Sequence, residues 1–286
     1  MAHGGFRFMI GLLILTGLVI TVSVILLHFT FYFFKAEAKN NYGIIDVGWG
    51  LGFVWIAWSL ILIRTQLLGV NSNFLSLITV LVTTIWGVRL STHIRRRNEG
   101  KPEDYRYIAM RAKIQLPWRK LKGFVKIFLV QALFMFLIAW VLIANIMVSG
   151  NLIEPWMYGP LLGGLFVWMV GFYFQAVGDA QLASFKKNPE NKGKLITTGL
   201  WALTRHPNYV GEVFMWWGIT IMGFGNGFII SVPWLPFIAI FSALVVTFLL
   251  RYLSGVPLLE KRMVNHPDFA AYAKRTSIFL PRLPKK

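Results

Sequence analysis

Long apolar runs constrain this chain more than any other feature. The run from Phe8 to Phe34 and several later runs carry almost no charge, and each reaches the length of about 18 residues or more at which a run predicts a membrane span, since about 20 residues of helix cross the hydrocarbon. The first run is too long for a signal-peptide core, so it counts as a span. The mean hydropathy of +0.61 agrees. The predicted fold class is an all-α, polytopic membrane protein.

Seven transmembrane helices are predicted, separated by polar or basic connections. They cover residues 8–34, 43–63, 74–92, 123–149, 157–180, 208–231 and 233–254. No repeat or low-complexity tract interrupts them, so we expect a single transmembrane domain over residues 1–286.

The distribution of Lys and Arg predicts the orientation of these spans. Eleven lie between Arg89 and Lys122, five between Lys186 and Arg205, and eight from Arg251 to the end, whereas the connections 150–156 and 225–232 hold none. Because cytoplasmic loops carry the excess of positive charge, the N-terminus is expected outside and the C-terminus in the cytoplasm. The excess charge is assigned to the membrane surface and not to nucleic acid.

Polar residues at the end of the fifth predicted span form one stripe. If the helix continues, Gln175, Asp179 and Lys186 follow the helical period and share a face. An amide, a carboxylate and an ammonium group then stand together, a set that suits a ribose or amide edge and a phosphate. A structural salt-bridge stripe is the alternative.

A second polar group opens the sixth span. Pro207 suits the first turn of a helix, whose N-terminal dipole would then point toward Arg205 and His206. Arg205, Asn208 and Glu212 fall on one face, with Tyr209 beside them, and helix starts of this kind bind anions. An interfacial basic pair is the plainer interpretation of Arg205 and His206.

Four segments carry a family resemblance over nearly the whole chain. They are Thr204-Arg-His-Pro-Asn-Tyr-Val-Gly-Glu212, Asp46-Val-Gly-Trp-Gly50, Asp104-Tyr-Arg-Tyr107 and Lys274-Arg-Thr-Ser-Ile-Phe-Leu-Pro281. The chain resembles the superfamily of steroid 5α-reductases, C14 sterol reductases and isoprenylcysteine carboxyl methyltransferases, and within it the bacterial steroid 5α-reductase-like group of membrane enzymes. The resemblance implies a substrate cavity in the N-terminal half and a cofactor pocket in the C-terminal half, residues 157–286.

The resemblance implies NADPH as the cofactor, with S-adenosylmethionine as the alternative used by the methyltransferases. Asn208 and Glu212 match the reductase version of the signature, and Gln175, Asp179 and Lys186 match a reductase triplet by spacing. Lys261 lies where many relatives place histidines that contact the cofactor. The predicted cofactor-binding residues are therefore Gln175, Asp179, Lys186, Arg205, His206, Asn208, Tyr209, Glu212 and Lys261.

Candidate catalytic residues lie in the N-terminal half. Asp46 is similar in placement to an acid that steroid reductases use at the substrate carbonyl, and a carboxyl group in apolar surroundings can stay protonated as a donor. A simple helix cap is the alternative. Aligning His93-Ile-Arg-Arg-Arg97 with the family pattern His-Tyr-x-x-Arg matches His93 and places Ile94 at the expected phenol, so Tyr105 or Tyr107 would supply that group.

Three functions follow from these patterns. The first is an NADPH-dependent oxidoreductase that reduces a C=C bond of a steroid-, sterol- or isoprenoid-like substrate entering from the bilayer. The second is a membrane methyltransferase of the isoprenylcysteine type, and the third is a lipid-binding protein of the same fold without catalysis. Membrane lipids are the expected partners and a bacterial inner membrane the expected location. No metal site is expected, because no motif has metal-ligand spacing.

Overall fold

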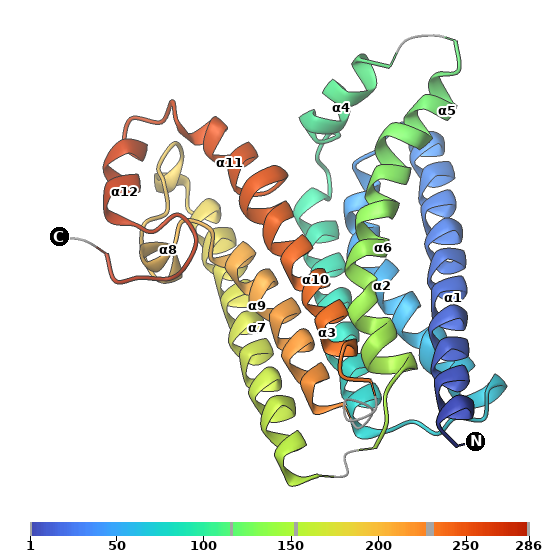
Figure 1. Ribbon diagram of the computed structural model, residues 1–286. Helices are drawn as coiled ribbons and strands as arrows, with labels where there is room; N and C mark the ends of the chain where they lie inside the picture. The colour runs from blue at the N-terminus through green and yellow to red at the C-terminus, as the bar shows by residue number, and fades with distance from the viewer. Residues whose placement is uncertain (1, 115–116, 152–153, 227–231, 285–286) are drawn as a thin grey trace. The chain divides into compact units, whose positions relative to one another are not determined.

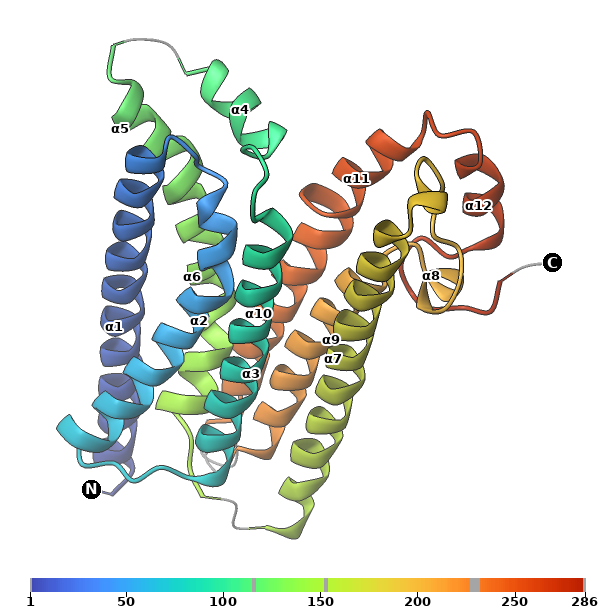
Figure 2. The same ribbon diagram turned by 180° about the vertical axis from the view of Figure 1, so that it is seen from behind.

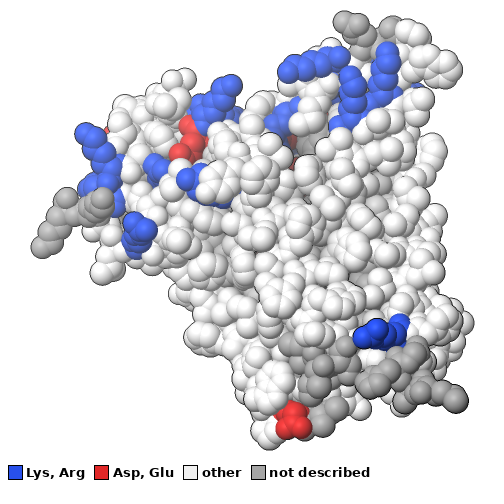
Figure 3. Space-filling view, in the orientation of Figure 1, with Lys and Arg blue, Asp and Glu red and all other residues white. Residues whose placement is uncertain are grey.

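A computed structural model describes residues 2–114, 117–151, 154–226 and 232–284 (Figure 1). Within these ranges the regular elements are helices, with one isolated bridge between Thr204 and Ser277. The prediction of an all-α polytopic membrane protein is confirmed. Most of the face that Figure 3 shows is uncharged, and its Lys and Arg side chains lie toward the edges of that face.

Six helical segments of the described residues are long and apolar enough to cross a membrane. They cover Gly5–Lys39, Ile44–Leu67, Phe74–Asn98, Arg119–Met147, Pro155–Lys187 and Leu235–Met263. The predicted span 208–231 corresponds in its first part to helix α9, Pro207–Met222, while residues 227–231 lie outside the described residues. The seventh crossing and the orientation stay predictions.

The chain divides into two compact units. Unit 1 contains Met1–Met157 and Asn226–Ala239, and unit 2 contains Tyr158–Gly225 and Ile240–Lys286. Helix α10, Leu235–Phe248, begins in the first unit and continues in the second.

Unit 1 is built on four long helices, α1 (Ala2–Lys39), α2 (Ile44–Leu62), α3 (Phe74–Asn98) and α6 (Val130–Leu142) (Figure 2). Short helices α4 (Tyr105–Ala112) and α5 (Arg119–Gly123) lie in the connection before α6. Helices α2 and α3 approach at Gly50 and Gly87, where a Cβ on Gly87 would lie 2.6 Å from the Gly50 carbonyl oxygen. Small residues allow this contact in a membrane, where close van der Waals packing drives helix association.

A buried arginine in unit 1 donates hydrogen bonds to backbone carbonyls. Arg64 is 2% exposed and follows α2 in a π-helical turn, Ile63–Leu67. Its Nη1 donates to the Ile146 carbonyl at 2.6 Å, and its Nη2 donates to the Ser149 carbonyl at 2.7 Å. Ile146 lies in the last turn of a π-helical segment, Ile143–Met147, and Ser149 lies just after it, where carbonyls lack intrahelical donors. Sequence reasoning did not single out Arg64, because the predicted span stopped at residue 63.

Unit 2 is built on α7 (Tyr158–Lys187) and α9, which run side by side in Figures 1 and 2. Gly164 faces Gly218 and Gly171 faces Gly211, so the two helices are antiparallel. A Cβ on Gly171 would lie 2.6 Å from the Gly211 carbonyl oxygen. Side chains that follow Gly171 on α7 are therefore brought to the start of α9.

The C-terminal part of unit 2 returns to the start of α9. Helices α11 (Val256–Met263) and α12 (Phe269–Arg275) are followed by a tail. This tail pairs with the segment around short helix α8, Leu200–Leu203, because the Arg205 N–H donates to the Ser277 carbonyl at 2.9 Å and the Arg282 N–H donates to the Leu203 carbonyl at 3.0 Å.

Candidate functional site

An acid, a phenol and a guanidinium group meet in unit 1. Asp46 stands in the first turn of α2 and accepts a hydrogen bond from the Tyr107 hydroxyl. Arg106 pairs with the other Asp46 oxygen, with Nη2 to Oδ2 at 3.0 Å. Tyr107 is 4% exposed. The sequence left open whether Tyr105 or Tyr107 supplies the phenol. The phenol that lies at Asp46 is that of Tyr107.

Short helix α4 presents these side chains. Asp104 caps it, accepting from the Arg106 N–H at 2.9 Å and from Arg106 Nε at 3.0 Å. This cap holds Arg106 beside Asp46. The sequence alone did not distinguish Arg106 from the other arginines of the loop. Gln131 of α6 donates to the Tyr107 oxygen at 3.5 Å.

The environment favours a protonated Tyr107 and an ionised Asp104. Burial, followed by the charge of Asp46, raises the pKa of the Tyr107 phenol well above its usual value. Burial also acts to raise the pKa of Asp104, but its hydrogen bonds with Arg106 outweigh it, and that pKa is lowered. Tyr107 is therefore a proton donor at neutral pH.

Tyr105 and His93 lie in other surroundings. Tyr105 is 46% exposed, and its position two residues before Tyr107 points it about 200° away around the helix. His93 is half-buried on α3. Both stay candidates on the family resemblance alone.

The two predicted polar stripes of unit 2 face each other. Helix α7 continues to Lys187, so the helical register predicted for Gln175 and Asp179 is confirmed. The Gln175 amide donates to Glu212, and the Asn208 amide donates to Asp179 Oδ1 at 3.1 Å. We call these contacts the amide–carboxylate pairs. Gln175, Asp179 and Glu212 are 3%, 6% and 8% exposed, respectively.

Arg205 and His206 meet an acid that sequence reasoning did not assign to the site. Glu260 Oε1 lies 3.0 Å from Arg205 Nε and 3.0 Å from His206 Nε2. Glu260 was noticeable as one of only eleven acids in the chain. Helix α9 begins at Pro207 as predicted, and the His206 ring stacks on Tyr209.

The remaining predicted cofactor residues are at the surface. Lys186 is exposed in the last turn of α7, and Lys261 is exposed beside Glu260 on α11. Each could reach a ligand only from solvent or from the membrane surface.

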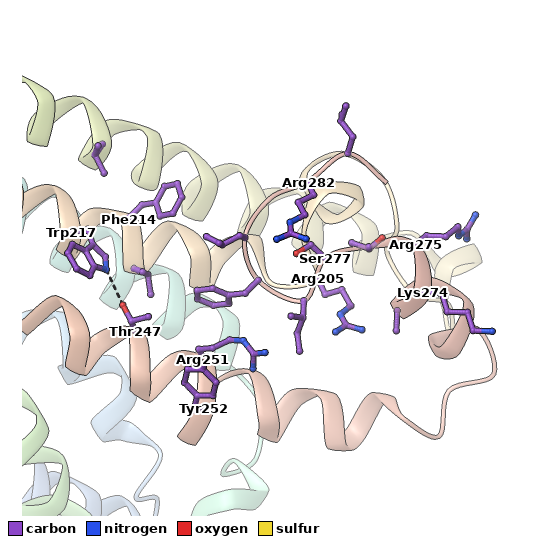
Figure 4. Close-up of a pocket in the computed structure, with 18 of the residues that line it drawn as sticks. Arg205, Phe214, Trp217, Thr247, Arg251, Tyr252, Lys274, Arg275, Ser277 and Arg282 are labelled. Carbon is purple, nitrogen blue, oxygen red and sulfur yellow. Dashed lines mark hydrogen bonds between the residues drawn. The ribbon is translucent and has the colours of Figure 1, made fainter. Parts of the chain in front are cut away.

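A cavity of about 910 Å³ opens on another side of α9 (Figure 4). Its lining includes Val213, Phe214, Trp217 and Ile221, residues of α9, and the C-terminal residues 273–280. Because successive helical residues are about 100° apart, Val213 and Trp217 lie more than about 90° around the helix from Asn208 and Glu212. We call this space the tail cavity, and the amide–carboxylate pairs do not line it.

The residues of unit 2 fit a polar nucleotide-like cofactor. Arg205 and His206 are 8% and 1% exposed, and the buried His206 Nδ1 has no hydrogen-bond partner among the described residues. Burying an unpaired polar atom is costly, which points to a missing partner. Donors at a helix start and two buried carboxylates together match the anionic groups and the hydroxyls of such a cofactor.

These features define an integral membrane protein of all-α fold. The chain belongs to the family described as "Protein of unknown function (DUF1295)", whose model matches residues 32–276. It is 35% identical over 77 residues to "Steroid 5-alpha-reductase DET2" of Gossypium hirsutum, covering 25% of this chain and 30% of that protein. It is 47% identical over 49 residues to "Probable O-methyltransferase ustE" of Ustilaginoidea virens, covering 17% of each.

The chain therefore spans less than a third of the length of these curated relatives. Both names fit the superfamily of membrane reductases and methyltransferases that the sequence resembles. The relatives come from a plant and a fungus, so they give no support to the expected bacterial inner membrane. No solved structure matches the chain.

Proposed function

We propose that this protein is a membrane-embedded, NAD(P)H-dependent reductase of a C=C bond in a steroid-, sterol- or isoprenoid-like substrate. The observation that carries the proposal is the set of buried amide–carboxylate pairs at the start of α9. Asn208 and Glu212 are the signature residues by which the chain resembles reductases, and the similarity to a steroid 5-alpha-reductase supports the same choice.

Unit 2 would hold the cofactor. Asp179 and Glu212 can accept from ribose hydroxyls or from the carboxamide, while Arg205, His206 and Asn208 donate. Glu260 orients Arg205 and His206 through its two 3.0 Å contacts. A bound nicotinamide would supply a hydride to the electron-poor carbon of the double bond.

Unit 1 would supply the acid. A substrate carbonyl conjugated with the double bond would take over the Tyr107 O–H hydrogen bond that Asp46 accepts in the structure, and this would draw electrons toward the carbonyl oxygen. Asp46 and Gln131 hold the phenol, and Arg106 fixes Asp46. After hydride addition, uptake of a proton from water by the carbon next to the carbonyl would complete the saturated product.

Cofactor binding tests the proposal directly. We expect heat on titrating the purified protein with NADPH or NADH and none with S-adenosylmethionine. Asp179→Asn should weaken binding by about ten-fold or more, because a carboxylate that accepts hydrogen bonds contributes roughly 1.5–3 kcal/mol. Lys192→Gln, a change at an exposed position away from the pairs, is the control. Heat from S-adenosylmethionine alone would overturn the reductase.

A second candidate is methyl transfer from S-adenosylmethionine. It is favoured by the 47% identity to a probable O-methyltransferase, although this covers 17% of the chain. Transfer of a labelled methyl group to lipid or to a prenylated thiol by the purified protein would establish it. Bound NADPH without any such transfer would remove it.

A further inference from the structure

The tail cavity has two chemically different ends. One end carries basic residues, Arg205, Arg251 and Arg282, with Lys274 and Arg275 at its edge. The other end is apolar and is lined by Val167, Phe214 and Trp217, among others. Figure 4 shows the Arg205 and Arg251 guanidinium groups directed into the same space, while Lys274 and Arg275 extend away from it.

The basic end keeps its positive charge. Arg205 pairs with Glu260, but Arg251, Lys274, Arg275 and Arg282 have no carboxylate partner within the part of the chain that the structure describes. The cavity lining includes no Asp or Glu. Like charges gathered without counter-charges repel one another, and an anion bound among them would relieve this repulsion.

Aromatic rings hold two of these arginines in place. Arg205 is 8% exposed and lies over the Phe269 ring at 5.6 Å, and Arg251 lies over the Tyr252 ring at 4.8 Å. Such cation–π contacts fix the planes of the guanidinium groups. The basic end is thus a built feature rather than a set of mobile surface charges.

The apolar end follows the sides of helices α7, α9 and α10. From Val213 to Ile221 it extends about 12 Å along α9 at the helical rise of about 1.5 Å per residue. The polar atom of Trp217 is already used, because its Nε1 donates to Thr247 Oγ1 at 3.1 Å. Thr247 donates in turn to the Ala243 carbonyl at 2.7 Å. The apolar end of the cavity therefore suits a hydrocarbon chain.

We propose that the tail cavity binds an anionic phospholipid, with the phosphate at Arg251 and Arg282 and an acyl chain along Val167, Phe214 and Trp217. Guanidinium groups match phosphate oxygens in pairs. Basic pockets between transmembrane helices bind anionic head groups for this reason. A soluble phosphate would leave the apolar end unused, and the amide–carboxylate pairs face another side of α9.

The proposal does not depend on the reductase reaction. Arg205 borders both the tail cavity and the predicted cofactor residues, so the test uses Arg251 and Arg282 instead. Neither of them belongs to the cofactor or acid sites described above.

Lipid titration of the full chain tests the proposal. Delipidated protein in neutral detergent is titrated with phosphatidylglycerol, phosphatidylcholine or inorganic phosphate, and bound lipid is counted by native mass spectrometry. We expect phosphatidylglycerol to bind most tightly. Arg251→Gln and Arg282→Gln should each weaken it by about five-fold or more, given roughly 1 kcal/mol for each cation near a membrane anion.

Matched variants separate the cavity from general surface charge. Arg275→Gln removes the same charge from the same tail, but its side chain extends away from the cavity, so binding should stay within about two-fold of the parent. Arg251→Lys keeps the charge but loses the paired guanidinium contacts, so it should bind more tightly than Arg251→Gln and less tightly than the parent, an order that a general folding defect would not produce. Val167→Trp should weaken phosphatidylglycerol by filling the apolar end while leaving the head-group contacts in place.

Four results would overturn the proposal. The first is equal loss of binding in Arg275→Gln and Arg251→Gln, which would indicate surface charge alone. The second is phosphatidylcholine bound as tightly as phosphatidylglycerol. The third is inorganic phosphate bound as tightly as the lipid, which would assign the site to a free anion. The fourth is stoichiometric displacement of the lipid by NADPH, which would assign the cavity to the cofactor.

Discussion

The packing of α7 against α9 gives the sharpest test of the structure, through the substitution Gly211→Ala. A Cβ at Gly211 would lie 2.5 Å from the backbone nitrogen of Gln175 and closer still to the Gly171 carbonyl oxygen. Ordinary contacts begin at 3.4 Å, so the two helices would have to separate by about 1 Å. Both colliding atoms belong to backbone and cannot rotate away.

The size of the effect follows from two opposing contributions. Alanine favours a helix over glycine by about 1 kcal/mol, whereas overpacking a close interface destabilises by about 1–3 kcal/mol and occasionally more. We expect a net loss of up to about 2 kcal/mol, or a fall in Tm of up to roughly 8 °C at about 2–4 °C per kcal/mol. The separation would also pull Gln175, which lies one turn after Gly171 on α7, away from Glu212. We expect this to weaken cofactor binding.

Thermal unfolding in detergent, followed by tryptophan fluorescence, measures this change. The control is Gly163→Ala on α7, where a Cβ would meet nothing within 4 Å. With no clash to offset the better helix former, Gly163→Ala should raise Tm slightly. Equal Tm values for the two variants would refute the close antiparallel packing, and with it the placement of the amide–carboxylate pairs.

Three further predictions concern single groups. Tyr107→Phe should lower kcat by about 10²-fold or more with little change in KM, because general acids contribute about 10²–10⁴-fold, while the exposed Tyr105→Phe should retain activity; steady-state kinetics of the reductase compares the two, and an equal loss in both would contradict the assignment. The buried Tyr272 hydroxyl donates to the Trp201 carbonyl at 2.6 Å, so Tyr272→Phe should lower the free energy of unfolding by about 1–3 kcal/mol by leaving that carbonyl without its donor, and denaturant titration measures it. Since burial raises the pKa of Tyr272, its stabilisation is complete below about pH 10 and is lost above it; Tyr272→Phe should therefore lose less stability between pH 9 and 11 than the parent. The lowered pKa of Asp104 predicts the opposite sign: its contribution is present above about pH 4 and is lost as pH falls further, so Asp104→Asn should flatten the acid limb of a Tm-against-pH curve, and an unchanged limb would refute it.

Helical periodicity alone predicted which polar residues of unit 2 share a helix face. Gln175 and Asp179 share a face because a helix repeats every 3.6 residues, and Pro207 marks a helix start because its missing N–H is harmless there. Periodicity could not show which side chains pair across the two helices. That register comes from the glycine contacts, and the backbone of α7 occupies the space beside Gly211.

Other parts of the site were beyond sequence reasoning because they depend on long-range contacts. Arg106 could not be told from its neighbouring arginines until its position on α4 placed it 3.0 Å from Asp46. Glu260 lies more than fifty residues after His206 in the sequence, yet it pairs with both Arg205 and His206. A scarce acid after an apolar helix was the available signal for Glu260, and a glutamine inside an apolar span was the signal for Gln131.

The return of the C-terminal tail to the start of α9 has a consequence for biosynthesis. The Arg205 N–H donates to the Ser277 carbonyl, and the Leu203 carbonyl accepts from the Arg282 N–H. A nascent chain emerging from the ribosome cannot complete the backbone hydrogen bonds of Leu203 and Arg205 until residues 277 and 282 have been made. Ligands that need Arg205 in this position can therefore stabilise only a chain that extends at least to residue 282.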